Sequence, residues 1–405
     1  MLSISLPEMR ELERAEFDLG VLAGNGLRRG RTTGSCATAA VKAALYMMLC
    51  QREQDRVDVT LPDGLHYLVV PIQRTRWLDA QTVRAEVRKD GGDDPDNTHG
   101  ATIFADVRRN HGGDIAFRAG MGVGTATQPG LRVAVGEPAI NPVPRAMMRQ
   151  AVAEVLKEAG QLQRARQPVA AVPDATLQPA QGFDLTIGCE NGEVIARKTF
   201  NPRLGIVGGI SILGTSGIVE PMSLASWIAS VEVYVRVALG GGATSVAYLP
   251  GKIGRAFAQE VLGLPEKRTV QIANFLGDAL AFTQNALQEE RRQLDILWLA
   301  GHPGKLAKVL DDVWDTHSGK SGMAMGAVAR VAAERGFSAG IINQLEQANT
   351  VEAAVEQLRN MPGAQALWQD IEERIAQQAQ ARVPAVRRVA VRLFDLEGRA
   401  LGAAA

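Results

Sequence analysis

The chain has 405 residues, of which 46% are hydrophobic, and its 44 basic side chains equal its 44 acidic ones. This length predicts about two domains, on a prior of roughly 150 residues each, and the balanced charge excludes a global field that attracts nucleic acid or a membrane surface. Three cysteines, Cys36, Cys50 and Cys189, lack CxxC spacing, which excludes a zinc or disulfide framework and favours a reducing compartment. We therefore expect a cytoplasmic enzyme without a leader or a membrane-spanning segment.

Residues 1–222 predict an α+β domain built largely of antiparallel strands. Pro62-Asp63-Gly64 separates two strand-like segments, at 57–61 and 65–73, as in a β-hairpin. Further strands are expected at 82–89, 101–109, 114–119, 183–189 and 193–200, the last two as a hairpin around Asn191-Gly192. Helices are expected at 35–50 and 144–158, the second ending at Gly160. Residues 161–181 are rich in Gln, Ala and Pro without apolar periodicity, which predicts an exposed insertion.

Residues 204–220 are too rich in glycine for a helix and too apolar for an ordinary loop. Five glycines permit positive φ and close backbone approach, whereas the aliphatic side chains between them demand burial. A tight turn through the core and a loop that contacts a ligand fit this pattern equally well, and the polar flanking residues tip the balance towards a ligand. The expected contacts are Asn201, Arg203, Gly208, Gly209, Ser211, Thr215 and Glu220.

Residues 223–382 predict an α/β domain. After a helix at 223–239, three short apolar strands are each followed by a glycine-containing loop and a helix, and these strands are expected at 245–249, 269–273 and 294–300. Such units imply a parallel sheet with ligands outside the carboxyl ends of its strands. Further helices are expected at 321–335, 351–359 and 367–378, and residues 383–405 supply a last strand, at 385–393, and a tail. The pattern leaves open which sheet this strand joins.

The loop after the third parallel strand reads G-H-P-G-K-L and fails as a phosphate-binding P-loop, because the first glycine and the Ser or Thr after the lysine are missing. Gly304 and Lys305 would still offer backbone N–H groups and an ammonium to an anion, although an exposed, solvated lysine fits equally well. His302 and His317 could lie together across the helix, where a structural role is more common than a catalytic one. Gly301 and Ser318 flank this candidate anion site.

An acidic loop lies between two expected strands. It contains Asp90, Asp93, Asp94 and Asp96, followed by Thr98 and His99. The carboxylates are dense enough for a hard cation, but their spacing does not match the calcium loop, so we expect no protein-bound metal. A plain polar turn, favoured by Gly91, Gly92 and Pro95, is the alternative.

The segment T-T-G-S-C-A-T-A-A, residues 32–40, predicts the start of a tightly packed helix. Thr33 or Ser35 can cap its first free N–H groups, and the alanines favour a core helix with an ordinary cap. Thr32 and Thr33 also lie beside three arginines that favour capture of an anion by their guanidinium groups. These arginines are Arg28, Arg29 and Arg31.

Four blocks of this chain, in order, resemble the cobalt-precorrin-5B C(1)-methyltransferases (CbiD) of corrin-ring biosynthesis. The blocks are L-R-R-G-R-T-T-G-S-C-A-T-A-A (27–40), V-R-K-D-G-G-D-D-P-D-N-T-H-G-A (87–101), the glycine-rich T-F-N-P-R-L to V-E-P (199–221), and G-H-P-G-K-L-A-K (301–308) with D-T-H-S (315–318). Together they span most of the chain, and four ordered matches are far more specific than one. The chain departs from the family pattern at Arg31, Gly91 and Asn97, where Tyr, Ala and Val are more common.

The resemblance implies an S-adenosylmethionine-dependent methyltransferase that converts cobalt-precorrin-5B to cobalt-precorrin-6A in anaerobic cobalamin biosynthesis. Carbon 1 of the ring would attack the sulfonium methyl group and release S-adenosylhomocysteine, which requires alignment and exclusion of water more than a strong acid or base. Cobalt would belong to the substrate. In this interpretation carboxylates of the acidic loop, including Asp94, bind the sulfonium and the ribose diol, Asp93 or His99 relieves the macrocycle of a proton, and the arginines bind its carboxylate arms.

Two other classes remain open. A kinase or dehydrogenase would use the glycine loops of the second domain for a phosphate-containing cofactor, but the fingerprint motifs are missing. A tetrapyrrole carrier would bind the pigment without methyl transfer. The sequence leaves open which domain binds the donor, which binds the acceptor, and whether the chain forms a homo-oligomer.

Overall fold

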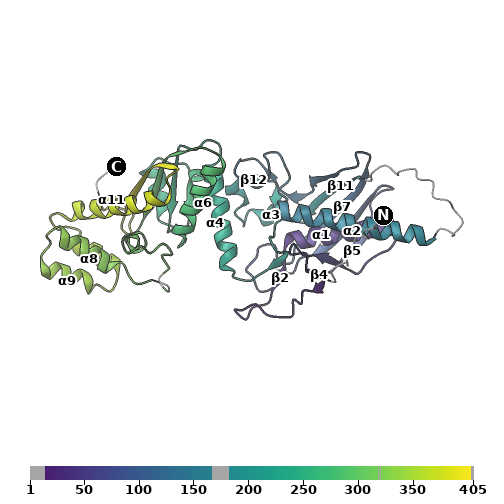
Figure 1. The fold of residues 1–405 in the computed structure, drawn as a ribbon, viewed down its shortest axis with the longest axis horizontal. Helices are drawn as coiled ribbons and strands as arrows, with labels where there is room; N and C mark the ends of the chain where they lie inside the picture. Colours follow the sequence, from purple (N-terminus) through teal and green to yellow (C-terminus); the bar gives the residue numbers. More distant parts are fainter. Residues whose placement is uncertain (1–13, 167–181, 318, 320, 403–405) are drawn as a thin grey trace, which may run out of the picture. The chain divides into compact units, whose positions relative to one another are not determined.

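The computed structural model describes residues 14–166, 182–317, 319 and 321–402 (Figure 1). The chain divides into two compact units: unit 1 comprises Met1–Thr127 and Arg132–Ser223, and unit 2 comprises Gln128–Leu131 and Leu224–Ala405. Most of the segment expected as an exposed insertion, residues 167–181, lies outside the described residues.

A five-stranded sheet forms the centre of unit 1. Its strands follow the order β5 (Arg74–Trp77), β6 (Thr82–Arg88), β7 (Thr102–Asn110), β11 (Gly182–Cys189) and β8 (Ile115–Ala119). Neighbouring strands pair antiparallel, except for β11 and β8, which pair parallel. A smaller sheet holds the expected hairpin of β3 (Arg56–Thr60) and β4 (His66–Pro71), with β1 (Ala15–Glu16) parallel to β4. The expected α+β fold of this half is confirmed.

Helix α1 (Thr33–Cys50) packs against β6 and β7, and α2 (Pro142–Arg166) lies beside it (Figure 1). The small side chains of α1 allow this close packing, so its residues from Thr33 to Leu45 are all buried. Among the described residues, this helix alone has the length and apolar composition of a membrane span, but 78% of it is buried inside the protein, as in a core helix.

The glycine-rich segment forms short strands rather than one continuous loop. The strand β12 (Ile206–Val207) pairs with β10 (Thr125–Ala126), and β13 (Gly209–Ile210) pairs with β9 (Gly122–Val123). The strand β14 (Ile218–Val219) pairs antiparallel with β2 (Gly30–Arg31), just before α1. The segment therefore joins the N-terminal block to the rest of unit 1.

Two secondary-structure elements expected in unit 1 differ from those observed. Residues 193–200 do not form a hairpin strand: α3 (Gly192–Ala196) and a turn follow, and a 3-10 helix η1 (Asn201–Leu204) comes next. The reason is that β11 already pairs with β7 on one side and β8 on the other, so no free edge remains for a returning strand. Helix α2 also continues past Gly160 to Arg166, because Gly160 does not adopt the left-handed conformation that ends a helix.

Unit 2 contains the expected parallel sheet. Its strand order is β16 (Thr269–Gln271), β15 (Ser245–Leu249), β17 (Leu294–Gly301) and β18 (Val386–Leu393), and all three neighbouring pairs are parallel. The last strand, whose sheet the sequence left open, thus lies at the edge beside β17. The α/β fold expected for this half is confirmed.

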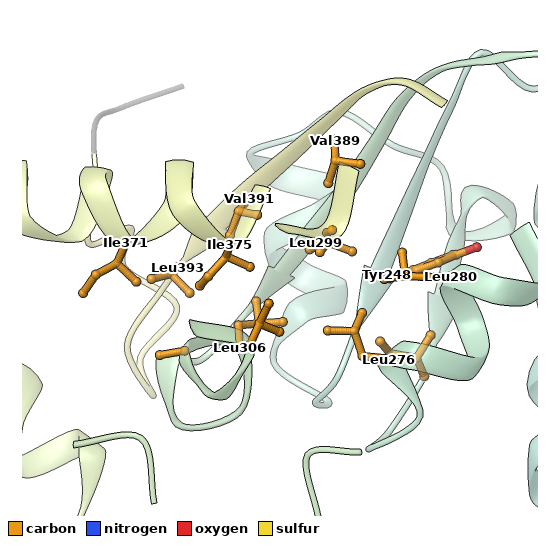
Figure 2. Close-up of a cluster of buried hydrophobic side chains, with 14 of the residues drawn as sticks. Tyr248, Leu276, Leu280, Leu299, Leu306, Ile371, Ile375, Val389, Val391 and Leu393 are labelled. Atoms are coloured by element: carbon orange, nitrogen blue, oxygen red, sulfur yellow. The ribbon is translucent and has the colours of Figure 1, made fainter. Parts of the chain in front are cut away.

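The main core of unit 2 lies between one face of the sheet and helices α4 (Leu224–Leu239), α6 (Leu276–Glu289) and α11 (Ala364–Arg382). Figure 2 shows Val391 and Leu393 of β18 close to Ile371 and Ile375 of α11. A smaller apolar cluster on the other face includes α5 (Gly254–Glu260). The remaining elements are η2 (Glu266–Arg268), α7 (Pro303–Leu306), η3 (Ala307–Asp311), α8 (Met325–Glu334), α9 (Ala339–Glu346) and α10 (Val351–Leu358), of which η2 and α9 were not expected.

Candidate functional site

Three of the four sequence blocks meet in unit 1. The N–H of Arg31 donates to the carbonyl of Asp90 at 2.7 Å, and the N–H of Asp93 donates to the carbonyl of Arg28 at 3.0 Å. On the other side, the strand β14 of the glycine-rich segment pairs with β2. We call this meeting point the junction and define it as residues 28–33, 89–100 and 213–222.

Glycines make the junction possible. A Cβ atom on Gly30 would lie 2.1 Å from the carbonyl carbon of Gly91, and one on Gly92 would lie 2.3 Å from the carbonyl oxygen of Arg28. Gly92 also has a φ of 66°. Backbone therefore packs directly on backbone here, which no other residue type permits.

Most carboxylates of the acidic loop make hydrogen bonds or ion pairs with other groups of the protein. Asp93 accepts from the backbone N–H of Arg28 at 2.8 Å and from its Nε at 3.2 Å, and these hydrogen bonds lower the pKa of Asp93. Asp94 Oδ1 accepts from the N–H of Met222 at 2.9 Å. These contacts hold the loop to the other two segments of the junction. They do not favour Asp93 as an acceptor of a proton.

Within the loop, Asp96, whose side chain is mostly buried, makes an ion pair with the fully buried Lys89. Burial raises the pKa of Asp96, but the Lys89 ammonium and the hydrogen bonds from Thr98 outweigh burial and hold that pKa below its usual range. Thr98 donates to Asp96 Oδ1 from both its backbone N–H, at 2.7 Å, and its hydroxyl. Thr98 thus has a partner within the protein.

His99 and Asp90 are the more open polar groups. The Nδ1 atom of His99 accepts from the N–H of Gly91 at 3.1 Å, so the neutral ring carries its proton on Nε2 and presents a donor. Asp90 accepts one short bond, from the N–H of Gly92 at 3.0 Å, and its second oxygen lies 3.9 Å from Nη1 of Arg31. Sequence patterns do not distinguish Asp90 from its acidic neighbours; only its contacts do.

The three arginines of the junction differ in how many contacts the protein itself makes with their guanidinium groups. Arg29 Nε contacts Glu220 Oε1 at 2.6 Å, and Arg28 binds Asp93. Arg31 is held loosely, because its Nε is buried without a hydrogen-bond partner among the described residues and its Nη2 lies 3.4 Å from the carbonyl of Val69.

Thr32 and Thr33 fasten the glycine-rich segment. Thr32 rather than Thr33 or Ser35 caps α1: its Oγ1 accepts from the N–H of Ser35 at 3.1 Å and contacts the carbonyl of Gly217 at 3.2 Å. Thr33 Oγ1 accepts from the N–H of Leu213 at 2.9 Å. Both threonines are buried, so their contacts are internal.

The expected contacts in the glycine-rich segment separate into buried and exposed groups. Asn201 Nδ2 donates to the carbonyl of Gly209 at 2.9 Å, and Ser211 Oγ donates to Asn201 Oδ1 at 3.2 Å. A Cβ on Gly209 would lie 2.1 Å from the carbonyl oxygen of Gly122, whereas Gly208, at φ 92°, has no atom within 4 Å of that position. Asn201, Gly209 and Ser211 therefore stabilise the fold, whereas Gly208 faces open space.

The expectation that all aliphatic residues of this segment are buried is wrong. Val207 is 62% exposed and Leu213 is 49% exposed. Thr215 and Glu220 in the same segment are also exposed, and the Arg203 guanidinium lies 5.8 Å from the ring of Phe200. The segment therefore has an apolar outer surface as well as a buried side.

In unit 2, Lys305 joins the loops that follow three parallel strands. Its Nζ donates to the carbonyl of Pro250, after β15, at 2.9 Å and to the carbonyl of Ala273, after β16, at 3.3 Å. The expected meeting of the three loops is confirmed, and we call residues 250–253, 272–275 and 302–305 the strand-end loops. Of the two alternatives for this residue, the solvated lysine is not what the structure has: Lys305 is partly buried, and burial, with a smaller effect of Lys308, lowers its pKa.

His302 is engaged through both ring nitrogens. Its Nδ1 accepts from the N–H of Gly304 at 3.0 Å, and its Nε2 lies 2.7 Å from Glu352 Oε2. Helix α7 is only four residues long, and its first N–H groups already bind His302, so it does not offer the free helix start that the sequence suggested. Gly301 ends β17 close to the ring of Pro250.

His317 is exposed, and its Nδ1 accepts from the N–H of Gly319 at 3.0 Å. Ser318, its expected companion, lies outside the described residues. The N–H of Thr316 donates to the carbonyl of Asn274 at 3.0 Å, which attaches this segment to the strand-end loops.

Nucleophilic and metal chemistry find little support among the described residues. Burial raises the pKa of the Cys36 thiol to about 12, and burial likewise raises that of Cys189 to about 12, so neither forms a thiolate near neutral pH. Within the parts of the chain that the structure describes, no group of three or more His, Cys, Asp or Glu residues could hold a metal ion.

Comparison with known proteins gives two family matches. The sequence model of the CbiD family matches residues 21–221, and that of the CbiD C-terminal domain matches residues 315–405. A cobalt-precorrin-5B C(1)-methyltransferase of Ralstonia nicotianae is 60% identical over 396 residues, which is 98% of each chain. One of Chromobacterium violaceum is 58% identical over 97% of this chain and 99% of its own. One of Moorella thermoacetica is 39% identical over 93% of this chain and 94% of its own.

Among solved structures, the crystal structure of the cobalamin biosynthesis protein CbiD from Archaeoglobus fulgidus is 24% identical, covers 74% of this chain and 86% of its own, and has a TM-score of 0.37.

Proposed function

The chain belongs to the CbiD family of cobalt-precorrin-5B C(1)-methyltransferases, and we propose that it methylates carbon 1 of cobalt-precorrin-5B with S-adenosylmethionine. The reaction breaks the bond between sulfur and the methyl carbon and forms a bond between that carbon and carbon 1. S-adenosylhomocysteine leaves with the electron pair of the broken bond, and a proton is lost as cobalt-precorrin-6A forms. Cobalt enters and leaves as part of the substrate.

The observation that carries this proposal is the junction. Three sequence blocks that are far apart in the chain meet there through backbone hydrogen bonds and glycine contacts. Such a framework supports a site that must align a donor and an acceptor to within a fraction of an ångström, which is the main requirement of a methyl transfer.

We place the methyl donor at the junction. Its sulfonium group is a cation and its ribose is a diol, and a carboxylate attracts the first and accepts hydrogen bonds from the second. Asp90 is the best candidate, because one of its oxygens has no close partner and the side chain is exposed. Glu220 is already bound to Arg29, and Asp93 to Arg28, which leaves both less available.

The candidate residues then fall into two roles. Six residues are proposed to contact ligand: the exposed His99, Gly208, Thr215 and Glu220, of which Glu220 would first have to release Arg29, the partly exposed Asp90, and Arg31, which is mostly buried but loosely held. Those that bond within unit 1, Thr32, Thr33, Asp93, Asp94, Thr98, Asn201, Gly209 and Ser211, are proposed to position the backbone around it. His99 presents an N–H donor in its neutral form and is suited to hold a ligand oxygen.

The test is anaerobic incubation of the purified protein with cobalt-precorrin-5B and S-adenosylmethionine carrying a carbon-13 methyl group. We expect one labelled methyl per corrinoid, attached to a quaternary ring carbon in the NMR spectrum, and an equal amount of S-adenosylhomocysteine. A folded protein that binds the corrinoid but transfers no label would be a carrier, and binding of ATP or NAD instead of the donor would indicate a nucleotide-dependent enzyme; either result contradicts the proposal.

A further inference from the structure

Two lysine ammonium groups lie at the carboxyl end of the parallel sheet in unit 2. Lys305 binds the carbonyls of Pro250 and Ala273. Lys308, which is only 5% exposed, donates from Nζ to the carbonyl of Thr316 at 3.2 Å and to Ser321 Oγ at 2.9 Å. Each ammonium therefore uses two of its three N–H groups on neutral oxygens.

The two groups belong to one cluster. The carbonyl that Lys308 binds belongs to Thr316, whose N–H donates to Asn274, and Asn274 directly follows the Ala273 that Lys305 binds. Ala273 has a φ of 51°, a strained conformation for a residue with a side chain. Lys308 also contributes to the lowered pKa of Lys305, so the two ammonium groups lie close enough for the Lys308 charge to repel that of Lys305.

This cluster lacks the negative charge that the chain supplies elsewhere. Among the described residues three lysines are buried: Lys42, which pairs with Glu154, Lys89, which pairs with Asp96, and Lys308. Neither Lys308 nor Lys305 makes an ion pair within the described parts of the chain, although a buried cation without a counter-charge is costly. The hydroxyl of Thr316, 3% exposed, also has no hydrogen-bond partner there.

We propose that Lys305, Lys308 and Thr316 bind a carboxylate arm of the corrinoid substrate. Lys305, the more exposed of the two lysines, offers its third N–H to the carboxylate, Lys308 adds its charge, and the Thr316 hydroxyl adds a donor. The inference rests on the proposed function, which supplies two sources of carboxylate. The charge balance selects between them: the corrinoid carries several acetate and propionate arms, whereas S-adenosylmethionine, with its sulfonium and ammonium groups, is a net cation that two uncompensated lysines repel.

The test measures binding of cobalt-precorrin-5B and of S-adenosylhomocysteine separately, by anaerobic titration, to the wild type, Lys308→Met and Thr316→Val. We expect Lys308→Met to weaken corrinoid binding about tenfold or more, as for loss of a charge-assisted contact, and Thr316→Val to weaken it severalfold. S-adenosylhomocysteine affinity should stay within twofold of wild type for both variants.

Two controls match these changes. Lys267→Met removes an exposed positive charge elsewhere in unit 2, and Thr75→Val removes another buried hydroxyl without a partner, in unit 1. Both should leave corrinoid affinity unchanged. Thr316→Val breaks no hydrogen bond and should keep the melting temperature of the wild type, so it decides the question alone if Lys308→Met does not fold.

Unchanged corrinoid affinity in the folded variants would overturn the inference, as would a loss confined to S-adenosylhomocysteine, which would assign the carboxylate to the donor. Failure of the proposed function has a different signature, because the wild type would then transfer no label in the methyl-transfer assay, whatever the variants bind.

Discussion

The junction of unit 1 and the strand-end loops of unit 2 both join segments that are distant in sequence, but they use different bonds. At the junction, glycine backbones pack on one another and the buried Lys89 has Asp96 as its partner. At the strand-end loops, lysine ammonium groups bind carbonyl oxygens, and neither Lys305 nor Lys308 meets a carboxylate among the described residues. We infer from this comparison that a buried lysine paired with a carboxylate of the protein stabilises the fold, whereas a lysine without such a partner is available to bind an anionic ligand.

The largest effect should come from the glycine packing at the junction. Gly92→Ala combines a left-handed backbone with a Cβ atom 2.3 Å from a carbonyl oxygen, and the backbone cannot move aside easily, so we expect a loss of about 4 kcal/mol or more in unfolding free energy. Gly208→Ala has a similar φ but open space, and should lose only about 1 kcal/mol. Urea unfolding followed by circular dichroism measures both. Equal losses would show that the close packing of Gly92 contributes nothing beyond its φ.

Replacing the two buried lysines by methionine tests the charge balance directly. Lys89→Met leaves the largely buried Asp96 without its partner and should cost about 3–5 kcal/mol. Lys308→Met leaves no carboxylate behind; it loses hydrogen bonds to a carbonyl and a hydroxyl, and we expect about 1–2 kcal/mol. Urea titration of each variant gives the two values. A cost for Lys308→Met equal to that for Lys89→Met would mean that Lys308 has a counter-charge after all.

The contributions of Glu372 in unit 2 and of Asp96 in unit 1 to stability should change with pH in opposite directions. Burial raises the pKa of Glu372 to about 7, against the opposing effects of the Leu393 N–H and the Arg392 guanidinium. The pKa of Glu372 in the folded protein lies above its unfolded value of about 4.3. The stability that Glu372 contributes is therefore complete below about pH 4.3 and is lost as pH rises through the folded pKa of about 7. Between pH 5 and pH 8 the wild type should lose about 2–3 kcal/mol relative to Glu372→Gln.

Tryptophan fluorescence can report this loss, because four of the five tryptophans, Trp227, Trp298, Trp314 and Trp368, lie in unit 2. Asp96 in unit 1 supplies the opposite case. Its folded pKa is lowered, so its contribution is present above the unfolded value of about 3.9 and disappears as pH falls through the folded pKa. A flat difference between wild type and Glu372→Gln from pH 5 to 8 would contradict the raised pKa.

The smallest expected effect concerns the open carboxylate of the junction. Asp90→Asn should raise the KM for S-adenosylmethionine about tenfold, as for a lost charge-assisted contact, without lowering the melting temperature. Asp93→Asn weakens the link to Arg28 and should do the reverse, lowering the melting temperature with little change in KM. Initial rates of labelled methyl transfer and thermal melting distinguish the two. An unchanged KM for Asp90→Asn would remove Asp90 from the donor site.

Local patterns in the sequence predict much of the fold. The hairpin of β3 and β4, helix α1 and the strands β15 and β17 follow from turn residues, capping and apolar runs that act within a few residues of one another. Residues 193–200 are different, because the strand pattern there is overruled by the two neighbours that β11 already has. The partner of β18 is likewise set by a contact between residues almost a hundred positions apart.

The sequence predicts which segments form the candidate site, but it does not predict which atoms in those segments bind one another. Glycine spacing and charged clusters point to the junction and to the strand-end loops. Nothing near Lys305 in the sequence indicates that its ammonium binds the carbonyls of Pro250 and Ala273, because main-chain acceptors carry no residue signature. For the same reason Asp90 looks like Asp93 until the hydrogen bonds of Arg28 are known.

The position of the edge strand β18 near the end of the chain determines the order in which the two units can fold during translation. This strand is drawn from residues 386–393 and completes the sheet beside β17, whereas the described strands of unit 1 end at Val219. The ribosome therefore synthesises all the described strands of unit 1 long before it synthesises β18. Unit 1 can fold on the growing chain before the sheet of unit 2 is complete. A message truncated shortly before codon 386 should yield a product in which unit 1 resists proteases and unit 2 does not.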